Sequence, residues 1–445
     1  MKRLIVLFCM CIVGMAHADE KPNVLVLFTD DQGTFDLNCY GSTDLSTPHL
    51  DDLAAEGIRF TQFYAASAVC SPSRAGLLTG RYPHRAGVPG NAESHPTQFG
   101  SGHGLKAEQV TMAEVFKQAG YTTGHFGKWH LGFETGPNRQ GFDLSVGFMG
   151  GCIDKFSHIN YGQAPWGKDK WHDWYRNGVE EWATGRHSGD LIVDEAIQFI
   201  EQAEETPWFI YAAFGTPHYP MNAYNKHWYE FQHLDEPRRS YAAVMATLDE
   251  QIGRLVDAID SLGLRENTII VFQSDHGHSN EARNNYGGGN AGHLRGAKAS
   301  LFEGGLRVPA IISWPSQIAQ NETRDQMAVS CDWLPTLAEF CNAPLTQSID
   351  GKSIISVIQN NSESPHDVWH WALREQWAVR KGDWKLLRNI NDTSDGRNKK
   401  LIKGPFLVNL EEDESESQNM ASEHPEVVQE LLELHKQWET WVSEP

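Results

Sequence analysis

NVLVLFTDD, residues 23–31, decides the fold of this chain. After Asn23, residues 24–28 are apolar without polar alternation, which is typical of a strand buried on both faces. Asp30 and Asp31 follow at the carboxyl end of that strand. Ligands gather at this end of the strands in open α/β sheets. The segment therefore predicts a parallel sheet with an acidic site at one edge.

Strand and helix patterns alternate along the chain beyond this segment. The predicted strands cover 208–214 and 268–272, and the predicted helices show apolar positions on one face over 48–54, 192–200 and 241–259. Thr47 and Pro48 are expected to begin the first of these helices, and Gly57 follows its end. Such alternation indicates an α/β fold, with a large mostly parallel sheet covered by helices on both faces.

The pattern changes near residue 350. Residues 377–387 are typical of a β-hairpin turning at Lys381-Gly382-Asp383, and 425–435 predict a terminal helix that begins near Pro425. We therefore expect a catalytic domain over 19–350 and a smaller antiparallel sheet with a helix over 351–445. A length of 445 residues suits one large and one small domain.

The first 18 residues resemble a secretory signal peptide. Lys2 and Arg3 precede an apolar run over 4–15 that is too short to span a bilayer, and Ala16-His17-Ala18 forms a small-x-small cleavage site. The sequence predicts an exported, periplasmic or secreted protein whose mature chain begins at Asp19. An uncleaved N-terminal anchor is the alternative.

Composition excludes one class of partner. The chain has 37 Lys and Arg against 58 Asp and Glu, a net charge of −21. Nucleic-acid binding requires a basic face, so no nucleic-acid partner is expected. An anionic membrane surface is disfavoured for the same reason.

An odd number of cysteines follows the cleavage site: Cys39, Cys70, Cys152, Cys331 and Cys341. In an exported protein this indicates one thiol with a role other than pairing. If Cys70 is that thiol, the other four form zero, one or two disulfides, and the sequence leaves the number open.

Cys70-Ser71-Pro72-Ser73-Arg74, continued by Leu78-Thr79-Gly80-Arg81, is the most specific motif. Pro72 fits a first helical position, so Cys70 is expected at or just before a helix N-terminus, where the dipole favours an anion. Arg74 lies one turn further on. A buried structural cysteine is the alternative for a lone Cys-x-Pro.

This motif resembles the signature of the type I, arylsulfatase-like sulfatases of the alkaline phosphatase superfamily, and the likeness extends over nearly all of the mature chain. The resemblance implies an alkaline-phosphatase-like fold. It also implies that a formylglycine-generating maturation enzyme oxidises Cys70 to Cα-formylglycine, whose hydrate Arg74 holds. The overall motif order looks closest to the galactosamine-sulfatase-like branch.

The resemblance also assigns a metal site. Asp30 and Asp31 match one metal-binding pair and Asp275 and His276 the second, with Cys70 completing the set. Many members have Asn where this chain has His276. Three carboxylates with one imidazole suit Ca²⁺ better than Zn²⁺, with Mg²⁺ as the alternative.

The remaining catalytic residues match the family one by one: Lys128 and His130 in 127–132, His218 after Pro217, and Lys298 in 296–298. Lys128 and Lys298 would neutralise the transferring sulfuryl group. The resemblance makes His218, together with Lys298, the acid for the leaving alcohol. It makes His130 the base that releases sulfate from the second hydroxyl of the hydrate.

Two loops suggest contacts with sugars. Trp171 and Trp174 belong to an aromatic-rich segment over 158–182, and His293 and Arg295 belong to a Gly- and Asn-rich loop over 284–295. Aromatic rings can stack on sugars while polar groups bind hydroxyls. The tryptophans could equally anchor a long loop to the body of the protein.

These observations predict an exported sulfatase acting on sulfated oligo- or polysaccharides, on a galactose- or hexosamine-type residue at a chain end. The acidic body would repel a long polyanion, which favours exo action. A phosphodiesterase or phosphonate monoester hydrolase of the same superfamily is one alternative, and a catalytically dead carbohydrate-binding protein is another. The oligomeric state is left open.

Overall fold

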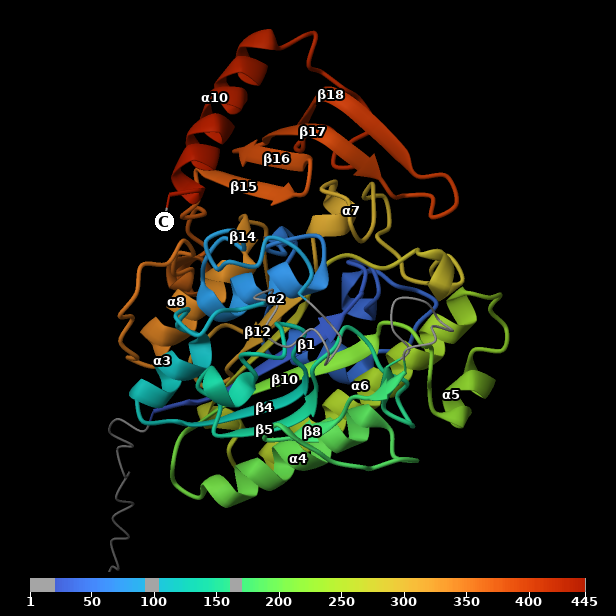
Figure 1. Cartoon of the computed structure of the whole chain (residues 1–445), viewed down its shortest axis with the longest axis vertical. Coiled ribbons are helices and arrows are strands. Elements are labelled where there is room, and N and C mark those ends of the chain that lie inside the picture. Colours follow the sequence, from blue (N-terminus) through green and yellow to red (C-terminus); the bar gives the residue numbers. More distant parts are fainter. Residues whose placement is uncertain (1–20, 93–103, 161–169, 445) are drawn as a thin grey trace, which may run out of the picture.

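The computed structural model describes residues 21–92, 104–160 and 170–444 (Figure 1). The expected signal peptide, 1–18, lies outside these ranges, as do residues 161–169 of the aromatic segment. Within them, no helix combines the length and the apolar character that a membrane span needs.

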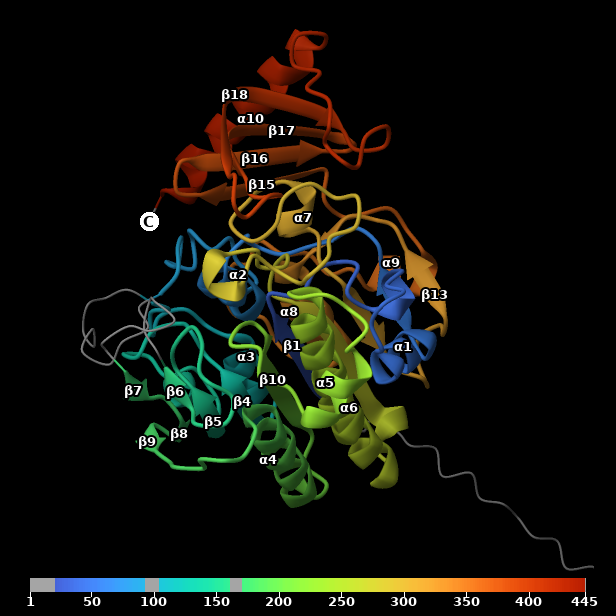
Figure 2. The ribbon, with the colours of Figure 1, turned by 90° about the vertical axis from the view of Figure 1, so that its right-hand side faces the viewer.

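A ten-stranded sheet forms the centre of the larger domain (Figures 1 and 2). From edge to edge its strands are β13 (Glu322–Arg324), β2 (Ile58–Phe60), β12 (Ala310–Ser313), β11 (Thr268–Ser274), β1 (Asn23–Asp30), β10 (Trp208–Pro217), β4 (Thr122–Lys128), β5 (Leu144–Phe148), β8 (Tyr175–Arg176) and β9 (Val179–Glu180). The five strands from β11 to β5 run parallel. Antiparallel partners flank them on both sides, so the mostly parallel sheet predicted from the sequence is confirmed.

Strand β1 is buried along its whole length, as its apolar run predicts. Val24, Val26 and Phe28 belong to the core on one face of the sheet. Leu25 and Leu27 belong to the core on the other. Side chains alternate across a strand, so a strand with a core on each face must be apolar at every position.

Helices cover both faces of the sheet. One face carries α1 (Pro48–Ala55), α4 (Ser188–Ala203) and α6 (Arg238–Ser261), with α5 (Asn225–Glu230) packed on α6. The other carries α2 (Cys70–Thr79), α3 (Met112–Gln118), α8 (Trp333–Phe340) and α9 (Ile355–Asn360). Thr47 precedes α1 as predicted, but its hydroxyl bonds Asn38 and does not cap the helix.

Shorter elements complete the larger domain. They are α7 (Glu303–Leu306), the strand pairs β3 (Phe63–Tyr64) with β14 (Ala328–Val329) and β6 (Ile159–Asn160) with β7 (Trp171–His172), and 3₁₀ turns at Asn38–Tyr40, Pro137–Arg139, Arg265–Asn267, Ala282–Asn284 and Ser330–Asp332.

The C-terminal layer is a four-stranded antiparallel sheet with one helix, at the top of Figure 1. It comprises β15 (Val368–Leu373), β16 (Gln376–Lys381), β17 (Trp384–Asp392), β18 (Lys400–Asn409) and α10 (Pro425–Val442). The predicted hairpin is β16–β17, which turns at Gly382 with φ 56°. The layer begins at Val368, later than the expected boundary at 351, because Ile354, Val357 and Ile358 pack into the core of the larger domain.

A buried ion network joins the two parts. Lys385 of β17 is inaccessible to solvent and donates to Glu303 of α7 at 2.8 Å and to Glu416 at 2.9 Å. Tyr64 donates to the other oxygen of Glu303, and Arg380 lies over the Tyr64 ring. The domain junction therefore contains charges that must stay paired, because an unpaired buried charge is costly.

All five cysteines of the expected mature chain are free thiols. Of the pairings that the sequence leaves open, the structure has none.

We predict that Lys385→Met lowers the apparent free energy of unfolding by about 3–5 kcal/mol, because Glu303 and Glu416 would remain buried without their cation. Lys381→Met is the matched control: its ammonium pairs with Glu430 at the surface, where both side chains are about half exposed. That change should cost less than about 1 kcal/mol. Urea unfolding of both variants measures the difference, and equal midpoints would contradict the proposed importance of the buried network.

Candidate active site

Four neighbouring parallel strands deliver the predicted polar residues to one edge of the sheet. In the order β11, β1, β10, β4, the residues at or just after their carboxyl ends are Asp275 and His276, Asp30 and Asp31, His218, and Lys128 with His130. Because these strands are parallel and adjacent, side chains that are far apart in sequence become neighbours.

Cys70 is the first residue of α2, and its Sγ faces this edge. It lies 3.3 Å from His276 Nε2 and 3.7 Å from Asp30 Oδ1. The thiol is 2% exposed. Pro72 occupies the third helical position rather than the first. The Sγ atom stands where the oxygens of a formylglycine hydrate would stand, at the positive end of the helix.

Two overlapping groups of side chains could hold a cation. The ligand atoms of Asp30, Cys70, Asp275 and His276 lie within 4.8 Å of one another, and so do those of Asp30, Asp31, Cys70 and His218. The five metal ligands expected from the sequence are thus brought together. Sequence reasoning did not place His218 in such a group.

The donor set fits a hard divalent cation. Asp31 Oδ2 is buried and has no hydrogen-bond partner among the described residues. Burial raises the pKa of Asp31 to about 6 and that of Asp275 to about 8. A cation such as Ca²⁺ would favour the charged form of both carboxylates and offset this cost of burial.

The imidazole rings are oriented by backbone carbonyls. His276 Nδ1 donates to Gly277 O at 2.9 Å, so Nε2 faces Cys70. Burial opposes a charge on this ring, but Asp275 and Cys70 raise the pKa of His276 to about 9. A cation bound at this site would favour the neutral imidazole of His276. His218 Nδ1 likewise bonds Tyr219 O at 2.8 Å, leaving Nε2 3.5 Å from Asp31.

Each buried carboxylate has its own cation. Lys128 Nζ lies 2.5 Å from Asp30 Oδ2, Lys298 Nζ lies 2.7 Å from Asp31 Oδ1, and Arg74 Nη2 lies 3.2 Å from Asp275 Oδ2. Burial alone would raise the pKa of the Cys70 thiol, but Lys128 and Lys298 hold it well below its ordinary value. The same positive field favours any anion bound at this point.

Arg74 is held in place by groups that the sequence did not single out. Its Nη1 lies 3.3 Å from the Tyr211 hydroxyl and donates to Lys128 O at 3.2 Å, and its guanidinium lies over the Phe28 ring. Tyr211 belongs to the predicted strand 208–214, but that strand pattern alone does not reveal a contact across the sheet.

His130 also reaches the site. It follows β4 with a left-handed backbone, φ 51°, and its side chain interacts with Cys70. Burial lowers the pKa of His130, which keeps the imidazole neutral and able to accept a proton.

Two of the predicted sugar-binding residues are used elsewhere. Trp174 is 1% exposed and stacks on Phe148 in the core, so the prediction of a sugar platform is wrong for it and the loop-anchor alternative applies. Arg295 donates to Asp392 and to Glu416 O, which ties its loop to the C-terminal layer. Three of the five N–H donors of the Arg295 guanidinium are therefore engaged at the domain junction.

The other two predicted sugar-binding residues are His293 and Trp171. His293 is exposed and pairs with Glu414 at 2.9 Å, which again joins the loop to the C-terminal layer. Trp171 is half-buried in the short strand β7. No described contact places either residue against Cys70 or the lysines, so their role as sugar-binding residues stays a prediction.

Comparisons with known proteins agree with this arrangement. The sulfatase family model matches residues 22–343, and a model described as N-sulphoglucosamine sulphohydrolase, C-terminal, matches residues 293–441. The chain is 31% identical to the N-acetylgalactosamine-6-O-sulfatase of Bacteroides thetaiotaomicron, over 93% of this chain and 92% of that protein. It is 33% identical to human arylsulfatase A, over 95% and 88%.

A solved structure agrees over the same extent. The crystal structure of Ps i-CgsB in complex with k-i-k-neocarrahexaose has a TM-score of 0.83 and 28% identity, covering 95% of this chain and 94% of that chain. Since the family model spans most of the chain and relatives above 30% identity align over nearly their whole length, the chain belongs to the sulfatase family and is a sulfuric ester hydrolase.

Proposed function

We propose that this sulfatase removes sulfate from a sulfated saccharide, with Cys70 matured to formylglycine and Ca²⁺ bound by Asp30, Asp31, Asp275 and His276. One observation carries the proposal: Cys70 Sγ lies at the N-terminus of α2, among the carboxylates and within the field of Lys128 and Lys298. The family is formylglycine-dependent and uses a divalent metal in general.

The modified residue and the metal would supply the nucleophile and the charge that activates it. This chain's own residues bind and orient the anion. Lys128 and Lys298 provide positive charge beside Asp30 and Asp31, and Arg74, on the same helix as Cys70, places its guanidinium against Asp275 and Lys128 O. Charge that is placed before the reaction stabilises the transferring group without reorganisation.

Proton transfer is assigned to two imidazoles. Burial and the nearby Lys298 lower the pKa of His218 in the ligand-free site. A bound sulfate ester brings negative charge, which raises that pKa and lets Nε2 protonate the leaving alcohol. The neutral His130 beside Cys70 is placed to accept the proton when sulfate is released.

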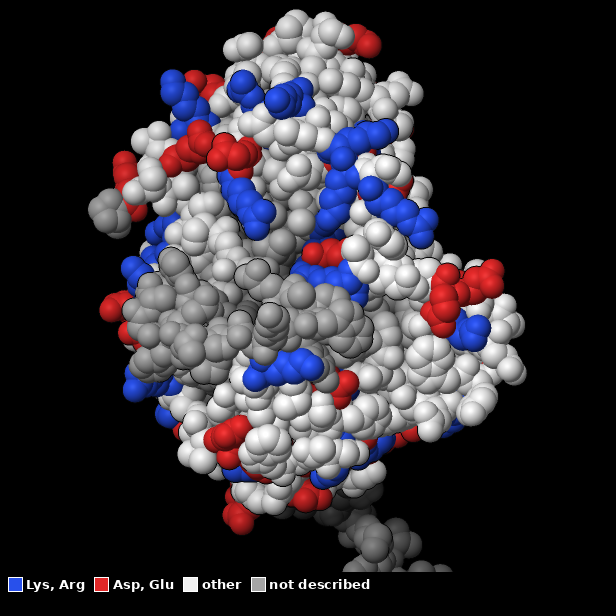
Figure 3. Space-filling view, turned by 45° about the vertical axis from the view of Figure 1, so that its right-hand side comes forward, with Lys and Arg blue, Asp and Glu red and all other residues white. Residues whose placement is uncertain are grey.

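The saccharide assignment rests on the relatives and on surface charge. Relatives above 30% identity are named for N-acetylgalactosamine 6-sulfate, and Ps i-CgsB was crystallised with a carrageenan-type oligosaccharide. Lys and Arg side chains gather near the junction of the two domains in Figure 3, although the net charge is −21. The phosphate-ester alternative is not favoured by these relatives. A catalytically dead binding protein is disfavoured because the whole set of catalytic residues converges.

We predict that short sulfated oligosaccharides are better substrates than intact polymer and that sulfate leaves from chain ends. The acidic body repels a polyanion, so added salt should help the polymer more than the oligomer. Sulfate release from a panel of defined sulfated sugars, with aryl sulfates as reference, measures this. Desulfation inside a polymer as fast as at its ends contradicts exo action, and turnover of aryl sulfates alone contradicts the saccharide assignment.

We predict that the mature protein differs from the printed sequence at its N-terminus and at Cys70, and that it contains calcium. We propose that the chain is exported and loses residues 1–18, because they have the charge, length and cleavage site of a signal peptide. When it is expressed with a maturation enzyme, mass spectrometry should find Asp19 at the N-terminus and an aldehyde in place of the thiol at Cys70. Metal analysis should find calcium. An active protein with an unmodified Cys70 would falsify the mechanism.

His218→Ala should damage turnover of sugar sulfates far more than turnover of activated aryl sulfates. A sugar alkoxide is a poor leaving group that needs a proton, whereas an activated phenolate does not. We expect kcat/KM to fall by about 10²–10⁴-fold more on the sugar. Steady-state kinetics on both substrates measures the ratio, and equal losses would make Lys298 the next candidate for the acid.

Lys298 is positioned by the C-terminal layer. The buried Thr393 hydroxyl accepts from Ala297 N and donates to Ala297 O, both at 3.0 Å. Ser394 Oγ accepts from Gly296 N at 2.8 Å, and Gln376 donates to Ala299 O at 3.1 Å. Ala299 itself has φ 69°, a strained conformation that surrounding contacts must hold. The loop on either side of the lysine is therefore fixed from the second domain.

We predict that Thr393→Val lowers kcat/KM by about tenfold, the effect of ~1.4 kcal/mol lost in the transition state. Valine keeps the shape of the side chain but leaves the buried amide of Ala297 without a partner, which frees the loop. Thr393→Ser retains the hydroxyl and should restore activity. Kinetics measures the effect on activity, and thermal unfolding measures the effect on stability. A serine variant as slow as the valine variant contradicts this positioning role.

A further inference from the structure

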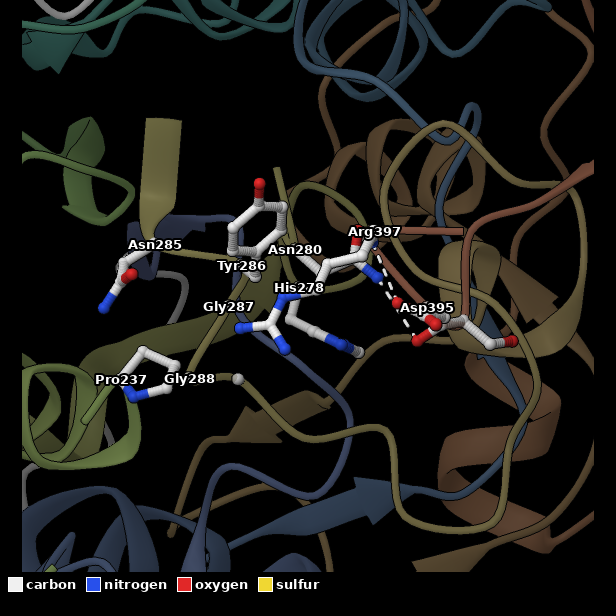
Figure 4. A pocket seen from close by; sticks show the side chains of 12 residues that line it. Pro237, His278, Asn280, Asn285, Tyr286, Gly287, Gly288, Asp395 and Arg397 are labelled. Atoms are coloured by element: carbon white, nitrogen blue, oxygen red, sulfur yellow. Dashed lines mark hydrogen bonds between the residues drawn. The ribbon is translucent and has the colours of Figure 1, made fainter. Parts of the chain in front are cut away.

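A cavity of about 360 Å³ lies between the two domains. One wall is the loop 278–289 of the catalytic domain, and the other is the turn 394–397 between β17 and β18 of the C-terminal layer. Pro237, just before α6, closes one side (Figure 4). Its volume lies in the ~300–1,000 Å³ range typical of small-molecule sites.

An aromatic ring and a cation line this cavity together. Tyr286 is 41% exposed, and the Arg397 guanidinium lies over its ring at 4.7 Å. Among the described residues, the guanidinium has no carboxylate within ion-pair distance. The neighbouring Asp395 carboxylate is already taken by the Arg397 backbone amide and the Asn398 side chain. The donors of Arg397 are thus free for a ligand.

Polar groups fill the base of the cavity. His278 Nδ1 is shielded from solvent and has no hydrogen-bond partner in the described part of the chain. Figure 4 shows His278 among the residues that line the cavity. Asn280 lies beside them and is anchored by a bond from its amide to Thr393 O. An exposed aromatic face beside a cation is a combination that can bind a sugar with an acidic substituent.

The loop that presents Tyr286 has an unusual backbone. Asn285 and Tyr286 both have positive φ, 47° and 63°, and Gly287 and Gly288 follow at 128° and 118°. For a bulky residue such as tyrosine this conformation costs energy and persists only where surrounding structure maintains it. The exposed ring is therefore held in place rather than free to fold back.

The cavity adjoins the sulfate-binding residues through shared backbone contacts. Lys298 N donates to His278 O at 2.9 Å, and Ser394 on the cavity rim accepts from Gly296 N. Glu281, on the same loop, lies close enough to Lys298 to shift the pKa of that lysine upward. The loop that lines the cavity is therefore bonded directly to the backbone of Lys298.

We propose that this cavity is a subsite for the sugar unit adjoining the sulfated one, with Tyr286 stacking on its ring and Arg397 binding an acidic substituent on it. The proposal rests on the proposed action on saccharides. It predicts a preference for substrates whose neighbouring sugar carries a sulfate or a carboxylate over those whose neighbouring sugar is neutral.

The test compares three substrates: a sulfated monosaccharide, a disaccharide with a neutral neighbour and a disaccharide with an acidic neighbour. Tyr286→Ala should lower kcat/KM on both disaccharides about tenfold more than on the monosaccharide, since stacking is lost. Arg397→Ala should lower it about tenfold more on the acidic disaccharide than on the neutral one. Tyr229→Ala and Arg388→Ala, both at exposed positions outside the cavity, are the matched controls.

The outcomes separate this proposal from the proposed function. If the wild-type enzyme, matured at Cys70, turns over no sulfated sugar, the saccharide assignment fails. If it turns over all three substrates but the cavity variants change them in equal proportion, the subsite proposal fails and the assigned activity stands. A loss confined to the disaccharides supports the subsite, and dependence of the Arg397 effect on the neighbour's charge supports its assigned ligand.

Discussion

Three carboxylates buried side by side dominate the energetics of this protein. Asp30, Asp31 and Asp275 lie beyond reach of water, where an uncompensated charge costs several kcal/mol. The chain compensates with three cations, one on each carboxylate. The protein groups alone therefore come close to neutrality, and a bound divalent cation makes the site positive. The attraction for a sulfate ester arises from that excess.

The parallel sheet provides the stability that offsets the cost of burying several charges at one edge. Strands β11, β1 and β10 have their apolar residues in the cores and only their last residues at the site, whereas β4 contributes Phe126 to the core and ends at Lys128. The sheet is therefore stabilised by burial along the strands, independently of the charges at their ends. Loop conformations that cost energy, such as Asp31 at φ 64° and His130 at φ 51°, occur only beyond the strand ends.

The sequence predicted those site residues whose role is visible in a local pattern, and it missed those whose role depends on contacts across the fold. Asp30 and Cys70 were predictable because a buried strand and a helix start are visible in local patterns, and a family motif ties them together. Trp174 was misassigned because a tryptophan in a loop has the same local pattern whether it packs inward or faces a ligand. Thr393 and Tyr211 were missed because their roles depend on contacts across the fold, which no spacing along the chain reveals.

The turn between β17 and β18 has two tasks that adjacent residues divide. Thr393 and Ser394 bond the backbone on the N-terminal side of Lys298, whereas Asp395, Gly396 and Arg397 line the cavity between the two domains. Substitutions of Arg397 can therefore change which neighbouring sugar fits without releasing the lysine, whereas Gly396 must stay glycine, because an added Cβ would lie 1.9 Å from Asn280 O. The sulfate site is built from strand ends of one domain and tolerates little change, because every charge there is buried and paired. Arg397, on a turn contributed by a separate antiparallel layer, is exposed and carries no such constraint, so we expect specificity for the saccharide to vary at this residue while the chemistry stays constant.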